Sequence, residues 1–206
     1  MRDDVLLALI SKVRDLSRRA DQVRAQAEPV RPPVDANTLE RAEVALGRRL
    51  PSTLRSAFLT IGDGGFGPGY GLLPLFPVGE SDDGESVVEL YRGLSSRDPE
   101  DPAWIWPADL VAFCDWGCAI RSCVDCSSEN GAVVTFDPNG HEIGGPMSSM
   151  FAQTHSSIEA WFRDWLNGVK IWDLMFEPDP DRARVGVNPF TREPMAFSAT
   201  RLRRLR

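Results

Sequence analysis

The sequence predicts an α+β fold, in which a mixed, largely antiparallel sheet is flanked by helices and preceded by a long N-terminal helix. Three short apolar runs between residues 110 and 136, bounded by turn residues, are typical of strands. Leu, Val and Ala recur at helical spacing between residues 6 and 27, and Trp and Phe do so between residues 158 and 166. These patterns indicate one sheet with helices packed against it.

The central strands are predicted over Leu110–Cys114, Cys118–Cys126 and Ala132–Phe136. Asn130-Gly131 precedes the third run, and it predicts a hairpin because both residues tolerate a positive φ. Leu72–Pro77 is a further apolar run, but its prolines cannot donate to a ladder of hydrogen bonds. We therefore expect this run at the edge of the sheet.

The N-terminal helix is expected to span about 25 residues before a cluster of prolines. Its apolar side chains alternate at spacings of three and four, as in a heptad seam: Leu6, Leu9, Val13, Leu16, Ala20, Val23 and Ala27. Such a seam packs either across its own domain or against a second copy, in which case residues 4–27 would form a homodimer. The sequence leaves both arrangements open.

Further helices are predicted from caps and apolar spacing. The first runs from Asp35 to Gly47, and Ser52 caps the second, which reaches Ile61. Shorter helical segments are expected over residues 87–94 and 147–152. A tryptophan-rich helix opens with a capping box of Ser156 and Glu159. The glycine-rich stretch over residues 62–71 is expected to form a flexible turn between a helix and a strand.

The length of 206 residues fits one domain with appendages. We expect an N-terminal helical extension over residues 1–31, an α+β domain over residues 32–180 and an irregular basic arm over residues 181–206. No apolar run approaches the roughly 20 residues of a membrane span. The first residues also lack the apolar core of a signal peptide, so a cytoplasmic protein that does not bind membranes is expected.

The charge is unevenly distributed. The net charge is −7, residues 62–146 hold 15 acidic residues against 3 arginines, and residues 182–206 hold 7 arginines against 1 glutamate. This balance argues against direct nucleic-acid binding. The acidic middle indicates either a solvated surface that the basic end partly neutralises or a face that binds a basic partner.

Residues 39–65, LERAEVALGRRLPSTLRSAFLTIGDGG, resemble the signature of the SUKH superfamily, the Smi/Knr-type domain. The shared features are an acidic helix, Leu46-Gly47, a basic pair, Leu50-Pro51, a short helix and a glycine-rich turn. The resemblance extends over about residues 35–170. It implies a SUKH-like α+β domain that binds other proteins. Bacterial members are commonly immunity proteins that neutralise polymorphic toxins, and a fungal branch regulates cell-wall synthesis.

Gly62–Gly67 matches the pattern G-x-G-x-x-G. A dinucleotide fingerprint needs a strand before the glycines and a helix after them, so that the helix N-terminus faces the pyrophosphate. Here the predicted order is reversed, and a nucleotide cofactor is not expected.

The four cysteines are Cys114, Cys118, Cys123 and Cys126. The last two have the spacing of one zinc knuckle, and the last three copy part of an iron–sulfur spacing. Zinc ribbons pair two knuckles across a longer loop than this sequence offers. Buried reduced thiols are therefore expected, with zinc, a disulfide or an iron–sulfur cluster as alternatives, and we predict no metal and no cofactor.

His141 and His155 lie beside a turn and a helix cap, outside any H-x-E or HExxH motif, and are expected at the surface. The chain also lacks a G-x-S-x-G nucleophile motif. We therefore expect a protein that is not an enzyme, and a metal-bearing enzyme is the third hypothesis.

The expected partner-binding surface consists of acidic loops and two tryptophans: Glu80, Asp82, Asp83, Glu85, Asp98, Glu100, Asp101, Trp104 and Trp106. Toxins that act on nucleic acid often have basic clefts, and complementary charge speeds association with such a cleft. Tryptophans beside charged residues often anchor protein interfaces. Ordinary solvated loops are the alternative interpretation for each acidic residue.

The expected function is that of a non-catalytic protein-binding module. The first hypothesis is an immunity protein that neutralises a cognate bacterial toxin domain by covering its active site. A regulatory or scaffolding protein without a toxin partner is the alternative.

Overall fold

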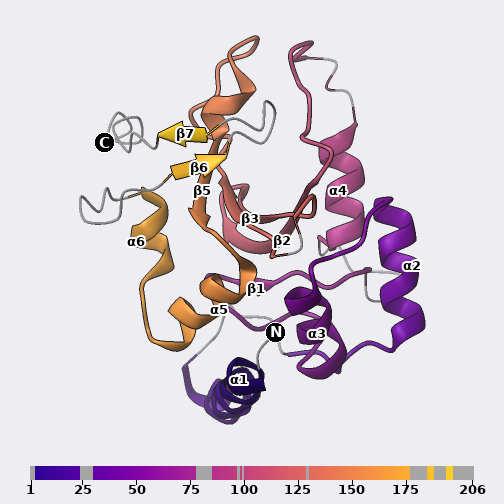
Figure 1. Cartoon of the computed structure of the whole chain (residues 1–206), viewed down its shortest axis with the longest axis vertical. Coiled ribbons are helices and arrows are strands. Elements are labelled where there is room, and N and C mark those ends of the chain that lie inside the picture. Colours follow the sequence, from indigo (N-terminus) through magenta and orange to yellow (C-terminus); the bar gives the residue numbers. More distant parts are fainter. Residues whose placement is uncertain are drawn as a thin grey trace.

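A computed structural model describes residues 3–23, 30–77, 85–96, 98, 100–128, 130–176, 185–187 and 194–196. In this part of the chain, helices surround a central sheet, as expected for the predicted α+β class (Figure 1). The sheet has five antiparallel strands in the order of the sequence: β1 (Gly71–Leu72), β2 (Leu110–Gly117), β3 (Ile120–Asp125), β4 (Val133–Phe136) and β5 (Phe151–His155). A separate antiparallel pair consists of β6 (Val185–Val187) and β7 (Pro194–Ala196).

The helices are α1 (Asp3–Val23), α2 (Ala36–Leu46), α3 (Ser52–Thr60), α4 (Val87–Ser95), α5 (Ile158–Leu166) and α6 (Ile171–Phe176), with one 3₁₀ turn, η1 (Met147–Met150). The predicted limits of α2 are confirmed. The Asp35 side chain accepts a hydrogen bond from the Thr38 N–H at 2.7 Å, and Gly47 ends the helix with a φ of 68°.

Two of the predicted caps are wrong by one residue. Ser52 is the first residue of α3 rather than its cap, because Pro51 occupies the cap position. In α5 the cap is Ser157, whose hydroxyl accepts a hydrogen bond from the Ala160 N–H, and not Ser156. Ser156 and Ser157 are equally good candidates for the N-cap by residue type, so only the path of the backbone decides which of them caps α5.

The helical segment predicted over residues 147–152 is wrong in part. Only η1 is helical, and the chain then enters β5, which the sequence analysis did not predict. The β5 strand pairs with β4, with Phe151 opposite Phe136. Short apolar runs do not distinguish helix from strand, and here the pairing with β4 determines the conformation.

The first hairpin turns later than predicted. β2 continues through Asp115-Trp116-Gly117, and the chain reverses at Cys118 and Ala119, whose φ values are 50° and 61°. Two consecutive residues of positive φ are typical of the tight type I′ hairpin turn, although neither residue is the usual Asn or Gly. The predicted hairpin at Asn130-Gly131 does join β3 to β4, through a longer connection over residues 126–132.

Both faces of the sheet are covered. Residues that alternate along the strands divide between two buried clusters. The first cluster joins the sheet to α1, α2, α3 and α5 through residues such as Leu9, Leu54, Phe58 and Trp161. The second contains Trp106, Phe136, Met150 and Phe151 on the opposite face, where α4, loop residues and η1 provide the cover.

The N-terminal helix packs on its own domain in the part whose side chains are described. Val5, Leu9 and Val13 are buried in the first cluster, and the Lys12 Nζ atom lies 4.6 Å from the centroid of the Trp165 ring in α5. A homodimer through residues 4–27 stays a prediction, and so does the division into a domain and two appendages. No helix among the described residues combines the length and apolarity needed to cross a bilayer.

Candidate partner-binding surface

The glycine-rich stretch after α3 folds back onto the edge strand. The Gly65 N–H donates to the Leu72 carbonyl at 2.9 Å, and the Leu72 N–H donates to the Phe66 carbonyl at 2.7 Å. A Cβ on Gly64, whose φ is 86°, would lie 2.7 Å from the Leu72 carbonyl oxygen. The stretch therefore closes the edge of the sheet at β1, with α3 before it and β1 after it, an order opposite to that of a dinucleotide site.

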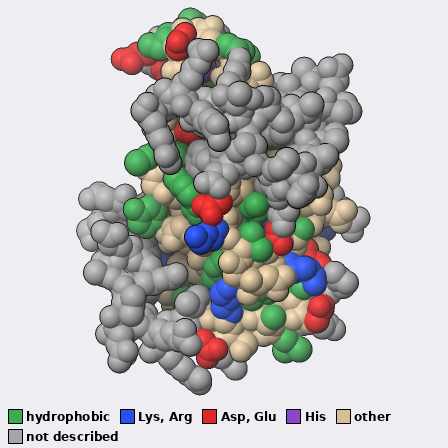
Figure 2. Space-filling view, turned by 90° about the vertical axis from the view of Figure 1, so that its left-hand side faces the viewer, with side chains coloured by type: hydrophobic (Ala, Val, Ile, Leu, Met, Phe, Trp, Pro, Cys, Tyr) green, Lys and Arg blue, Asp and Glu red, His purple; other side chains and the backbone are tan. Residues whose placement is uncertain are grey.

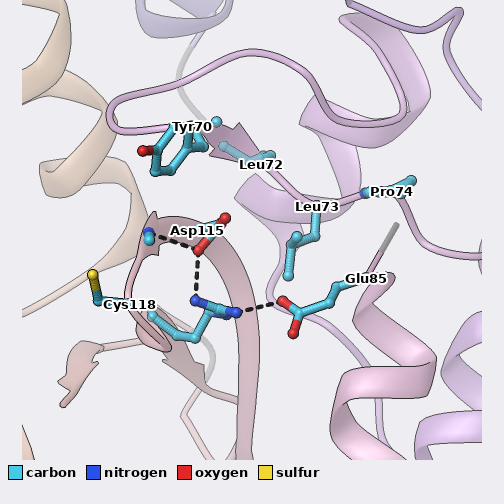
Figure 3. Close-up of a pocket in the computed structure, with 10 residues that line it drawn as sticks. Tyr70, Leu72, Leu73, Pro74, Glu85, Asp115 and Cys118 are labelled. Atoms are coloured by element: carbon cyan, nitrogen blue, oxygen red, sulfur yellow. Dashed lines mark hydrogen bonds and ion pairs between the residues drawn. The ribbon is translucent and has the colours of Figure 1, made fainter. Parts of the chain in front are cut away.

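A cleft of about 410 Å³ lies beside β1 and the start of β3 (Figure 3). Its lining includes Tyr70, Leu73, Glu85, Asp115 and Arg121. The Tyr70 ring is 46% exposed, so an aromatic side chain lies at the rim.

Arg121 lies buried between two carboxylates in this cleft. Its Nη1 atom is 2.5 Å from the Asp115 Oδ1 atom, and its Nη2 atom pairs with the Glu85 carboxylate. The same Asp115 oxygen accepts the Gly117 N–H at 2.9 Å, which fixes the carboxylate at the hairpin (Figure 3). The three side chains together carry one excess negative charge.

Three of the predicted acidic residues, Glu80, Asp82 and Asp83, lie outside the described residues. Among those described, Glu85 precedes the N-terminal end of α4, whereas Asp98 and Glu100 follow its C-terminal end. A helix of nine residues is roughly 13 Å long, so α4 separates Glu85 from Asp98 and Glu100. The use of these acidic residues in partner binding stays a prediction.

Asp101 was predicted as a surface carboxylate, but it is only 4% exposed. Its Oδ2 atom lies 2.7 Å from the His141 Nε2 atom, and its Oδ1 atom accepts the N–H groups of Ala103 at 3.0 Å and Gly144 at 3.1 Å. The hydrogen bond from His141 is the largest cause that lowers the pKa of Asp101, and the two backbone N–H groups add to it against the effect of desolvation. Asp101 therefore joins two loops.

The two predicted tryptophan anchors are mainly part of the second buried cluster. Trp106 is 7% exposed, and its Nε1 atom donates to the Leu110 carbonyl at 2.9 Å. Trp104 is partly exposed and donates to the Leu94 carbonyl at the end of α4. Both rings pack edge-on against Phe136. Their indole rings hold the loop in place.

The predicted surface position of the histidines is wrong. His155 is 7% exposed, and its Nε2 atom lies 3.3 Å from the Asp164 carboxylate of α5. The side chain of His141 is 10% exposed and is engaged by Asp101. Sequence position beside a turn or a cap did not reveal these acidic partners, of which Asp101 is 40 residues from His141 and Asp164 lies in the helix that follows His155.

All four cysteines are free thiols. Cys114 and Cys123 are buried as predicted and Cys126 is partly buried, whereas Cys118 is exposed in the hairpin turn. Burial raises the pKa of Cys114 and of Cys123, and it raises the pKa of Cys126 to about 12. Within the described ranges, no group of three or more His, Cys, Asp or Glu side chains is arranged to hold a metal ion.

Two exposed isoleucines were missed by the sequence analysis. Ile105 is 65% exposed and Ile143 is 73% exposed. Side chains in an extended segment alternate in direction, so the inward-facing Trp104 and Trp106 leave Ile105 pointing outward. The pattern Trp-Ile-Trp could have indicated this. Ile143 lies in a turn closed by a hydrogen bond from the Gly145 N–H to the Glu142 carbonyl at 2.7 Å.

Comparison with known proteins supports the resemblance noted in the sequence. The model of the SMI1 / KNR4 family (SUKH-1) matches residues 33–167, a range that extends from the cap of α2 through α5 and includes the whole five-stranded sheet. A search of curated proteins found no match to the chain. Because the matched range covers more than half of the 206 residues, the chain belongs to the SMI1 / KNR4 family (SUKH-1).

Proposed function

We propose that this protein is an immunity protein, which binds a cognate bacterial toxin domain in the cytoplasm and covers its active site without catalysis. Family membership over residues 33–167 is the observation that carries this proposal. Bacterial proteins of the SUKH superfamily are commonly immunity proteins, as the resemblance in the sequence implies.

The charge distribution supports a basic partner. Residues 62–146 hold 15 acidic residues against 3 arginines. Among the described residues, Glu100 and Glu142 are exposed carboxylates that a basic partner could reach. A toxin with a basic cleft would associate faster with such a surface, and more so at low ionic strength.

Co-expression tests the proposal in cells. A toxin domain encoded beside this gene is the expected partner, and the absence of one would count against the proposal. That toxin domain is induced with and without the protein. We expect survival to be restored by this protein and not by one from an unrelated toxin system. Failure of the protein to rescue cells would overturn the proposal.

A titration of the purified toxin tests the mode of action. A protein that blocks by binding inhibits in proportion to its amount, and inhibition is complete at one molecule per toxin when the toxin concentration exceeds Kd. An enzyme that inactivated the toxin would need far fewer molecules and would act progressively with time. Inhibition at a small fraction of one equivalent would therefore contradict the non-catalytic mode.

A further inference from the structure

We infer that the toxin binds one end of this protein, formed by residues 100–107 and 137–146. We call these residues the two-loop tip. The complementary surface on the toxin is an apolar socket bordered by Lys and Arg. The inference rests on the proposed function and specifies the surface that performs it. In Figure 1 both segments project from the same end of the sheet, beyond the C-terminal end of α4.

The tip carries one exposed isoleucine on each of its two loops, and we take these two side chains as its apolar centre. Ile105 and Ile143 are among the most exposed large apolar side chains in the described part of the chain. They lie on different loops, but the hydrogen bonds of Asp101 tie those loops together at His141 and Gly144. Interfaces between proteins commonly have an apolar centre that contributes most of the binding energy.

Contacts within the protein also support the conformation of the tip that exposes the two isoleucines. Trp104 and Trp106 anchor the first loop in the second buried cluster on both sides of Ile105. In the second loop, Ile143 precedes Gly144, whose φ of 76° is one that glycine adopts readily. A surface that is already ordered loses less conformational entropy on binding, and this favours tight association.

The rim of the tip is acidic. Glu100 and Glu142 are exposed there and Asp137 is partly exposed, whereas the fourth carboxylate, Asp101, is buried; no Lys or Arg occurs in the two segments. Figure 2 shows acidic and hydrophobic side chains gathered at this end, on the face in view. Such a rim repels nucleic-acid phosphates and anionic lipid headgroups, whereas it complements a rim of Lys and Arg on a protein.

The cleft beside β1 is the competing surface, and it is less suited to this role. Its two carboxylates are already paired with Arg121, so a basic partner would have to compete with that guanidinium. The acidic side chains of the tip that are exposed, Glu100 and Glu142, have no such partner among the described residues.

Two pairs of substitutions test the tip in the full-length protein. Ile105→Ser with Ile143→Ser removes the apolar centre, and Glu100→Lys with Glu142→Lys reverses the rim. The matched control lies on α2, where Val44 is 76% exposed and Glu40 is exposed. Val44→Ser and Glu40→Lys change the same kinds of side chain at a different site.

Binding is measured to a catalytically inactive form of the toxin domain encoded by the neighbouring gene. We expect the serine pair to raise Kd by about 100-fold, mainly through faster dissociation. The lysine pair should slow association by about 10-fold at low salt, with a smaller effect at high salt. The α2 variants should stay within about 2-fold of the parent protein.

Hydrogen exchange of the unmodified complex provides a second readout that does not depend on the variants folding. Backbone amides of the two-loop tip should become protected, and those of α2 should not. The assignment of the binding surface to the tip is overturned if the parent and the tip variants bind the toxin equally well, or if protection appears elsewhere. In that case the immunity function still stands. If the parent neither binds the toxin nor rescues cells, the proposed function itself fails.

Discussion

The Asp101 Oδ2 atom lies 2.7 Å from the His141 Nε2 atom and joins two loops that are 40 residues apart in the sequence. This contact joins the two segments that carry Ile105 and Ile143. It also explains why Asp101, one of the predicted surface carboxylates, is buried. Its carboxylate accepts hydrogen bonds from two backbone N–H groups and contacts a histidine within the protein. Each of the following predictions tests one such relationship.

The stability contributed by Asp101 should depend on pH. Its pKa is lower in the folded chain than the ordinary value of about 4, so its stabilising effect is present above that value and is lost as the pH falls through the folded pKa. We expect Asp101→Asn to unfold at lower urea concentration than the parent near neutral pH. The difference should shrink as the pH is lowered from about 5 to about 3.

Tryptophan fluorescence during urea titration measures this difference. Glu100→Gln is the control, because Glu100 is a neighbouring carboxylate that is exposed, and it should unfold like the parent at every pH. A gap between parent and Asp101→Asn that stays constant down to the lowest pH would show that the carboxylate charge is not the source of the stability.

The N-terminal helix should contribute to stability through one face. Leu9 is fully buried in the first cluster, whereas Leu7 is 67% exposed. Leu9→Ala should lower the free energy of unfolding by about 2–5 kcal/mol, because it leaves a cavity. Leu7→Ala should change it by less than about 0.5 kcal/mol. The free energies are obtained from urea unfolding at two protein concentrations tenfold apart.

The two concentrations separate packing within the chain from packing between chains. If residues 4–27 mediate a homodimer, the unfolding midpoint rises with protein concentration, since association stabilises the folded state by mass action. Equal losses for the two alanine variants would contradict the packing of this face on α5.

Arg121 should be the most important charge of the cleft. Arg121→Met keeps most of the side-chain volume but leaves Asp115 and Glu85 without the cation between them. We expect the free energy of unfolding to fall by about 1–3 kcal/mol, because both carboxylates lose their partner. Arg163→Met is the control, because Arg163 is 37% exposed and pairs with Glu159 along one helix. Such a pair contributes about 0.5 kcal/mol or less. Similar losses for both variants in urea unfolding would refute a special role for Arg121.

The cysteines should differ in reactivity. The thiolate is the reactive form, and burial keeps Cys114, Cys123 and Cys126 protonated, whereas Cys118 is exposed at the hairpin turn. A chromogenic disulfide reagent near pH 8 should therefore modify one thiol quickly in the folded protein and all four in urea. The fast phase should disappear in Cys118→Ser and persist in Cys126→Ser. Two fast thiols in the parent would contradict the burial of Cys126.

The site was harder to predict than the fold. The acidic loops with Trp104 and Trp106 were predicted to bind a partner, and this stays a prediction; composition does not tell whether a carboxylate faces solvent or a histidine 40 residues away. The exposed isoleucines were missed because an apolar residue is expected to be buried. Only the packing of the neighbouring tryptophans decides that Ile105 faces outward.

The sequence by itself determined the elements whose signals are local. α2 lies between Asp35 and Gly47 because a cap and a positive φ act on adjacent backbone groups. The central strands follow from their apolar runs. Tertiary structure alone decided β5, the reversal at Cys118 and Ala119, the burial of Asp101 and the separation of Glu85 from Asp98 and Glu100 by α4. These features depend on pairing and burial between residues distant in the chain, and the free energy of such contacts leaves no periodic pattern in the sequence.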